Sequence, residues 1–291
     1  MDEYRVKAHA KINLGLDVVK RLPDGYHQVR MIMQSIGLCD ELTLTPKGEG
    51  LSLSTDSAEL TTDESNLVCK AARLMLQKYH ISGGIHVHLQ KNIPIAAGLA
   101  GGSSDAAAVM RGINELFGLG LPLSRLMEDG VSIGADVPYC IMGGTALAEG
   151  IGEKLTALPP LPDCHILLVK PDISVSTKYV YEHLDREDSY PHPDIDQMTQ
   201  AVRAGRLEDI LKLLGNTLET VTAADHPVIA SLKERMSALG AGGSLMSGSG
   251  PTVFGIFRDK DSAESARRQM TQENPEKQIF LTAPVSLQHH A

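Results

Sequence analysis

The stretch Pro94-Ile95-Ala96-Ala97-Gly98-Leu99-Ala100-Gly101-Gly102-Ser103-Ser104-Asp105-Ala106-Ala107-Ala108 is the most informative part of this chain of 291 residues. The alternating segment Ile85–Leu89 precedes it and predicts a strand, and the pattern from about Asp105 to Phe117 predicts a helix. Glycines let backbone N–H groups approach a ligand closely, because no Cβ is in the way. The unpaired N–H groups and positive dipole end of the next helix favour an anion. The stretch therefore predicts a phosphate-binding loop.

Other interpretations of this loop use the same residue types. A purely structural turn, followed by a helix that Ser103 or Ser104 caps, remains possible. Serines in this position can also contact a phosphate or its magnesium ion. A Walker A loop is excluded because the chain has no Gly-Lys dipeptide, and a Rossmann fingerprint because the spacing G-x-G-x-x-G is absent.

Composition excludes several classes of protein. Apolar residues make up 42% of the chain and charged residues 22%, which is enough for a buried core and argues against disorder. No apolar run approaches the length of a membrane span, and the N-terminal residues do not resemble a signal peptide. The net charge is -9 without a basic block, which argues against nucleic-acid binding. Four scattered cysteines without a Cys-x-x-Cys pair predict a reducing cytoplasm; the oligomeric state is not predicted.

Helical and strand patterns alternate irregularly along the chain. We expect helices at about 66–79, 105–117, 176–185, 194–214, 227–239 and 260–272, and strands at 4–20, 29–38, 41–46, 85–89, 165–169, 244–247, 252–257 and 278–281. The class is therefore α+β rather than a regular parallel sheet. The stretch Pro159-Pro160-Leu161-Pro162 predicts a boundary between domains at 1–160 and 161–291.

Three segments carry a resemblance to a known family. They are Ala8-His9-Ala10-Lys11-Ile12-Asn13-Leu14-Gly15-Leu16, the glycine-rich loop, and Gly242–Phe254 with its Ser247-Gly248-Ser249-Gly250 turn. Together they resemble the GHMP kinase superfamily, in the family's order and over nearly the whole chain. The resemblance implies an N-terminal α/β domain like domain 2 of ribosomal protein S5, which binds ATP. It also implies a C-terminal ferredoxin-like domain that completes the acceptor site.

A narrower resemblance rests on Asp24-Gly25-Tyr26-His27 and Gly134-Ala135-Asp136-Val137-Pro138. These strings are similar to those of kinases that use ATP and Mg²⁺ to phosphorylate the 2-hydroxyl of 4-diphosphocytidyl-2-C-methyl-D-erythritol, in the non-mevalonate isoprenoid pathway. A GHMP kinase for another alcohol, such as homoserine or mevalonate, is the alternative, and a catalytically silent binding module is a third. Ala100 departs from the family's commoner glycine, and we expect tighter packing there without loss of function.

Lys11 and Asp136 are the candidate catalytic residues. A carboxylate within hydrogen-bond reach can take the proton of an acceptor hydroxyl, and an ammonium can orient that carboxylate and stabilise the transferring phosphoryl group. Taken alone, each residue is equally compatible with a buried ion pair or a solvated strand edge. The resemblance implies that Asp136 is the general base and Lys11 its electrostatic partner.

The resemblance also implies two sets of binding residues, while the magnesium ligands are not predicted. The ATP-binding set is Asn66, Leu67, Lys91, Pro94, Ala97, Gly98, Leu99, Ala100, Gly101, Gly102, Ser103 and Ser104. The substrate-binding set is Asn13, Tyr26, His27, Asp136, Thr177, Tyr181 and Gly248. Tyr26 and Tyr181 would sandwich the cytosine, and His27 would hydrogen-bond its edge. Asn66 and Leu67 also fit an ordinary helix start, and we interpret Asp185–Asp188 as a solvated helix end.

Overall fold

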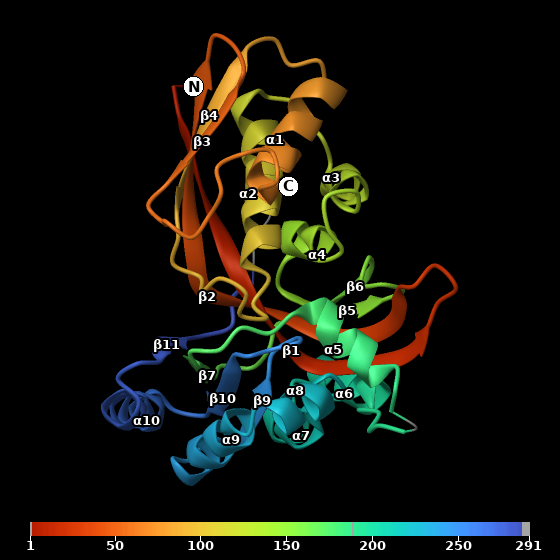
Figure 1. The fold of residues 1–291 in the computed structure, drawn as a ribbon, viewed down its shortest axis with the longest axis vertical. Coiled ribbons are helices and arrows are strands. Elements are labelled where there is room, and N and C mark those ends of the chain that lie inside the picture. Colours follow the sequence, from red (N-terminus) through yellow and green to blue (C-terminus); the bar gives the residue numbers. More distant parts are fainter. Residues whose placement is uncertain (1, 188, 287–291) are drawn as a thin grey trace. The chain divides into compact units, whose positions relative to one another are not determined.

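A computed structural model of the chain describes residues 2–187 and 189–286 (Figure 1). Two compact units are found: the first holds residues 2–10, 38–95 and 100–142, and the second 11–37, 96–99 and, apart from residue 188, 143–286. The chain passes between the units within the long strands β1 (Tyr4–Arg21) and β2 (His27–Lys47), and twice within the glycine-rich loop. The boundary expected at residue 160 lies inside the second unit, so the compact units and the expected domains divide the chain differently.

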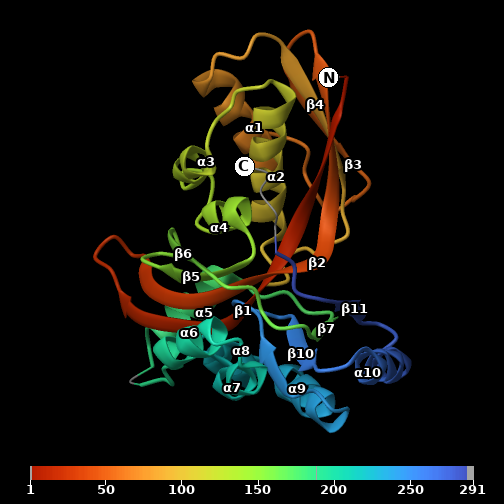
Figure 2. The same ribbon diagram turned by 180° about the vertical axis from the view of Figure 1, so that it is seen from behind.

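The first unit combines a sheet with helices. Its strands are β3 (Leu51–Thr55), β4 (Gly84–Gln90) and the unit's parts of β1 and β2, and its helices are α1 (Leu67–Lys78), α2 (Gly101–Leu116), α3 (Leu123–Gly130) and α4 (Val137–Met142). Strand β4 pairs in parallel with β3 and antiparallel with β2. Helices α1 and α2 pack together and run along this sheet in both views (Figures 1 and 2).

Small residues allow α2 to approach the sheet closely. Ala106, Ala107 and Ala108 are fully buried. A Cβ built on Gly112 would lie 2.7 Å from the Cδ2 atom of Leu44 in β2, so a larger residue would push the helix away. The sequence of α2 therefore sets the depth at which the helix, and the glycine-rich loop before it, sits on the sheet.

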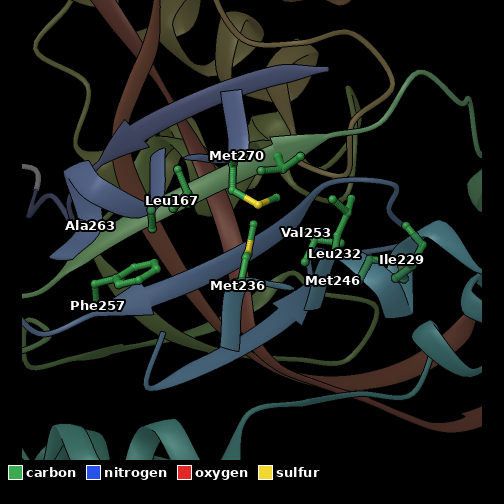
Figure 3. Packing of buried hydrophobic residues seen from close by; sticks show 11 residues of the cluster. Leu167, Ile229, Leu232, Met236, Met246, Val253, Phe257, Ala263 and Met270 are labelled. Atoms are coloured by element: carbon green, nitrogen blue, oxygen red, sulfur yellow. The ribbon is translucent and has the colours of Figure 1, made fainter. Parts of the chain in front are cut away.

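The second unit contains a four-stranded antiparallel sheet in the order β11-β7-β10-β9. The strands are β7 (His165–Lys170), β9 (Gly243–Met246), β10 (Val253–Phe257) and β11 (Gln278–Thr282). Helices α9 (Val228–Ala238) and α10 (Lys260–Glu273) cover one face, where Met236 and Met270 pack with Leu167, Val253 and Phe257 (Figure 3). Every residue of β10 is buried, which explains its continuous apolar run.

The other elements of the second unit surround its parts of β1 and β2. They are β5 (Thr145–Glu149), β6 (Lys154–Leu158), α5 (Thr177–Leu184), α6 (Ile195–Arg203), α7 (Leu207–Leu213), β8 (Gly215–Asn216) and α8 (Glu219–Asp225). Strand β5 pairs antiparallel with both β2 and β6, and β8 pairs in parallel with β1. No helix in the described part of the chain is long and apolar enough to cross a membrane.

Several predicted elements are confirmed and several are wrong. The mixed α+β class and the strand from residue 4 are confirmed. The two strands expected at 29–38 and 41–46 are one strand, β2, and the helix expected at 194–214 is divided at Gly205, whose φ is 62°. No prediction covered β3, α3, α4, β5, β6, β8 or α8. Most of these elements are short, so a periodic pattern has too few residues to emerge in them.

Candidate active site

The glycine-rich loop ends at a helix start that differs from the prediction. Helix α2 begins at Gly101, four positions before the expected Asp105, and its N-cap is Ala100, which has no side-chain cap bond. The first helical hydrogen bond runs from Ser104 N to Ala100 O over 2.9 Å. The expected capping role of Ser103 and Ser104 is therefore wrong, because both lie inside the first turn. The N–H groups of Gly101, Gly102 and Ser103 precede that first bond and form the donor set of an anion site.

Ala100 adopts the left-handed conformation, with φ at 56°. A residue with a Cβ pays about 1–2 kcal/mol there, whereas glycine does not. Tighter packing at Ala100, where the family commonly has glycine, stays a prediction, and the structure adds a cost in the backbone that the sequence did not predict. Ala96, in the same loop, has φ at 51° and carries the same kind of strain.

The two serines of the loop have different surroundings within the first unit. The Ser104 hydroxyl donates to His9 O over 2.6 Å and is buried. Ser103 faces the segment before α4, since a Cβ built on Gly134 would lie 3.8 Å from Ser103 Oγ. That segment includes Asp136, which directly precedes α4 and is half-buried, less sheltered than its apolar neighbours suggested. Ser103 and the Asp136 segment therefore lie close together.

A network within the second unit ties Lys11 to the loop and to the glycine turn. Lys11 Nζ donates to Asn13 Oδ1 over 2.8 Å and to Gly98 O over 3.2 Å, and Lys11 and Asn13 are 5% and 0% exposed. Ser247 Oγ also donates to Gly98 O, over 2.9 Å. A Cβ on Gly98 would lie 2.2 Å from Ser247 O, so only glycine fits. The structure thus brings together Lys11, Asn13 and Gly98 of the predicted set.

Gly248 belongs to the same network. It lies in the turn predicted at 247–250, where a built Cβ would be 3.4 Å from Lys11 Nζ. Asn216 Nδ2 donates to Gly248 O over 2.8 Å and holds the turn in place. Next to it, Thr177 at the start of α5 shares a 2.8 Å hydrogen bond with Ser249. Lys11 and Asp136 belong to different compact units, and their expected roles as electrostatic partner and general base stay predictions.

Lys91, expected in the ATP-binding set, lies in a buried ion cluster of the first unit. Its ammonium contacts Asp40 and lies 3.2 Å from Asp105 Oδ2, and the three side chains are at most 6% exposed. Asp40 Oδ1 accepts from the backbone N–H groups of Asn92 and Ile93. These contacts with Lys91, Asn92 and Ile93 explain how the acidic Asp40 can be buried within the continuous strand β2. A Cβ on Gly101 would lie 2.9 Å from Lys91 Nζ, so the cluster supports the start of α2.

The cluster contains two carboxyl groups for one ammonium. Burial raises the pKa of the Asp105 carboxyl well above its usual range, against the opposing effect of Lys91. Asp105 Oδ1 has no hydrogen-bond partner among the described residues. Both observations fit a cluster in which Asp105 carries a proton.

At the start of α1, Asn66 acts as the N-cap. Its side chain accepts from Val68 N over 2.9 Å and donates to Thr61 O over 2.8 Å. This geometry is the ordinary helix start that the sequence predicted for Asn66 as an alternative to ATP binding. Leu67 lies beside the glycine-rich loop, since a Cβ on Gly102 would be 3.5 Å from Leu67 Cδ1.

Aromatic residues of the second unit gather at the tip of the β1–β2 hairpin and on α5. The rings of His27 and Tyr181 stack with centroids 4.5 Å apart, while Tyr26 is 59% exposed. His27 Nε2 lies 2.8 Å from Asp185 Oδ1. Asp185 is the C-cap of α5 and residues 185–187 are exposed, which confirms the interpretation of a solvated helix end for them, although Asp185 also has a partner in His27. Asp188 lies outside the described residues. No local signal identifies Asp185, because its partner is far away in the sequence.

Comparisons with known proteins show the family to which the chain belongs. Residues 66–144 match the family model described as GHMP kinases N terminal domain, and residues 198–276 match GHMP kinases C terminal. A protein of Lachnospira eligens named 4-diphosphocytidyl-2-C-methyl-D-erythritol kinase is 52% identical, over 97% of this chain and 98% of its own. One of the same name from Acetivibrio thermocellus is 45% identical, over 98% and 100%.

Two solved structures also match this chain over nearly its whole length. A crystal structure of 4-(cytidine 5'-diphospho)-2C-methyl-D-erythritol kinase has a TM-score of 0.83 and 32% identity, over 98% of this chain and 100% of its own. Homoserine kinase from Cytophaga hutchinsonii has a TM-score of 0.80 at 19% identity, over 98% and 95%, and shows the shared fold alone. Since both family models and full-length relatives match, the chain belongs to the GHMP kinase family.

Proposed function

We propose that the chain transfers the γ-phosphoryl group of ATP to the 2-hydroxyl of 4-diphosphocytidyl-2-C-methyl-D-erythritol, a step of non-mevalonate isoprenoid synthesis. The observation that carries this proposal is the 52% identity, over nearly the whole chain, to a relative named as the kinase of that compound. A homoserine or mevalonate kinase is the rival, since the fold alone accommodates either.

The donor side is built on the glycine-rich loop. The N–H groups at the start of α2 would hold the phosphates, with Pro94, Ala97, Gly98 and Leu99 forming the preceding backbone. Asn66 and Leu67 would contact adenine, while Lys91 supports the loop from its buried cluster. Because the Ser104 hydroxyl already donates to His9 O, we assign Ser103 to a phosphate or its magnesium ion.

Mg²⁺ would be held mainly by the phosphates of the nucleotide and only to a small extent by protein side chains. Residues 2–187 and 189–286 contain no group of three His, Cys, Asp or Glu side chains that could hold a metal ion. Mg²⁺ commonly keeps several waters and binds substrate phosphates with few protein ligands. When bound, it would neutralise charge on the phosphate oxygens.

Lys11 and Asp136 would perform the chemistry. Asp136 would take the proton of the acceptor hydroxyl while its oxygen forms a bond to the γ-phosphorus and the bond to the ADP oxygen breaks. Lys11 would stabilise charge on the transferring group. The support is that Lys11 is buried and oriented by Asn13 and Gly98, and that the Asp136 segment adjoins Ser103.

The acceptor would lie against the second unit. Tyr26, His27 and Tyr181 supply flat rings for a pyrimidine, and stacking is worth about 1–3 kcal/mol per base. Asn13, Thr177 and Gly248 supply polar groups for the polyol and its phosphates. Homoserine and mevalonate have no base to stack, so these rings would be superfluous for the rival.

One assay tests the proposal. Purified protein is incubated with ATP, Mg²⁺ and, separately, the cytidylyl substrate, homoserine or mevalonate, and phosphorus NMR records ADP and any new phosphomonoester. We expect a new signal with the cytidylyl substrate alone. Turnover of homoserine or mevalonate would favour the rival, and turnover of none would favour a silent binding module.

A further inference from the structure

The contact between His27 and Asp185 joins two distant parts of the second unit. His27 begins β2 at the hairpin tip and Asp185 is the C-cap of α5, 158 positions later. The side chains are 10% and 22% exposed, and Nε2 and Oδ1 are 2.8 Å apart. The same helix supplies Tyr181, whose ring stacks on that of His27. Both the edge and the face of the imidazole are therefore held by α5.

This contact determines where the imidazole proton sits. An ionised carboxylate has only acceptor atoms, so Nε2 must be the protonated nitrogen of a neutral His27. Nδ1 then carries a lone pair and can only accept. Within the described part of the chain, His27 Nδ1 has no hydrogen-bond partner, although the ring is nine-tenths buried. Nδ1 is not one of the buried side-chain atoms that lack a partner, so it is accessible and can accept an N–H or O–H from solvent or from a ligand.

We propose that Asp185 is a positioning residue that fixes the Nε2–H tautomer of His27, so that Nδ1 accepts from the exocyclic amine of cytosine and disfavours uracil. This inference rests on the proposed function, because it requires a pyrimidine beside His27. Cytosine presents an amino group at C4, whereas uracil presents a carbonyl oxygen that would face the Nδ1 lone pair. The discrimination between cytosine and uracil therefore depends on the group attached to C4 of the base.

Arg21 secures the second oxygen of the same carboxylate. Its Nη1 atom lies 3.5 Å from Asp185 Oδ2, and the Arg21 side chain is 62% exposed. Asp185 thus contacts one residue from the end of β1 and one from the start of β2, and it holds the two ends of the hairpin tip to α5. The role is positional, since Asp185 acts on the base through His27.

The test uses the full-length chain labelled with ¹⁵N-histidine, and a His27→Gln variant to assign the His27 signals. Two-bond nitrogen–proton correlations report the tautomer. We expect Nε2–H in the wild type and a mixture in Asp185→Ala. Calorimetry with CDP and with UDP, at a saturating non-hydrolysable ATP analogue, should show the preference for CDP falling roughly tenfold in Asp185→Ala. Glu182→Gln, which removes a carboxylate from the same helix, should keep the wild-type preference.

The outcomes separate the inference from the proposed function. A wild-type chain that binds neither CDP nor UDP would refute the proposed function, and the inference with it. A wild-type chain that prefers CDP but carries Nδ1–H on His27 would refute the inference alone. So would an Asp185→Ala chain that keeps the full preference for CDP. Unchanged affinity for the ATP analogue shows that the variant is folded.

Discussion

Lys11 and Lys91 are both buried lysines next to the glycine-rich loop, but their ammonium groups meet different acceptors. Lys91 contacts the carboxyl groups of Asp40 and Asp105 in the first unit. Lys11 donates to an amide oxygen and a backbone carbonyl oxygen in the second, those of Asn13 and Gly98. A carboxylate offsets the charge of the ammonium it pairs with, whereas the oxygens of Asn13 and Gly98 orient the Lys11 ammonium.

Burial alone therefore does not identify a catalytic lysine. Lys91 compensates the buried Asp40 carboxylate and so maintains the support of the loop. Lys11 is oriented by the Asn13 amide and the Gly98 carbonyl at the point where the loop meets β1 and the 247–250 turn, and this position suits an ammonium that acts on a ligand. Substitutions that separate turnover from stability therefore test the comparison directly.

The largest effect is expected from Asp136→Asn, which tests the partner proposed for Lys11. An amide cannot take a proton from the acceptor hydroxyl, so turnover should fall by about 10²–10⁴-fold. The affinity for ATP should change little. Steady-state kinetics and nucleotide titration measure both quantities, with Glu115→Gln, an exposed carboxylate of α2, as the control. Turnover like that of the wild type would remove Asp136 from the mechanism.

The two lysines should respond differently to replacement by methionine. Lys91→Met leaves Asp40 and Asp105 buried without their cation, and should lower the free energy of unfolding by about 3 kcal/mol. Lys11→Met should cost less than half of that but lower turnover by about 10²-fold or more. Denaturant unfolding and kinetics on both variants give the measurement. A Lys11→Met chain that is unstable yet fully active would reverse the comparison.

Asp105→Asn sharpens the description of the Lys91 cluster through its pH dependence. Because the pKa of Asp105 is raised, the folded chain binds this proton more tightly than the unfolded chain. The resulting stability is present below about pH 4 and is lost as pH rises through the raised pKa. Asparagine cannot titrate, so the variant should gain stability relative to the wild type as pH rises. Unfolding curves at several pH values check this, and a constant difference would contradict a protonated Asp105.

The smallest effect is expected at Ala100, where the loop itself is strained. Ala100→Gly removes the cost of a left-handed alanine and should raise the free energy of unfolding by about 1 kcal/mol. Ala97→Gly is the matched control, because Ala97 is not in the left-handed region, so glycine there relieves no strain; it adds freedom to the unfolded chain and removes a buried methyl group. Equal effects of the two substitutions would show that the conformation of Ala100 stores no strain.

Much of the fold and part of the site could be predicted from the sequence alone. The alternation in β1, the glycine-rich loop and the 247–250 turn are local patterns, and they suffice for the α+β class and the kinase family. Local patterns encode periodicity and turn chemistry over a few residues. They encode neither the short elements after residue 118 nor the division of 194–214 at Gly205.

Only the tertiary structure decided where α2 begins and which partners the site residues have. The start at Gly101 follows from the backbone angle of Ala100, which the residue type does not reveal. The burial of Lys91 between two carboxylates, and the pairing of Asp185 with His27, join positions that are distant in the chain. Such contacts depend on how strands and helices meet in space, and a single sequence carries no local signal for them.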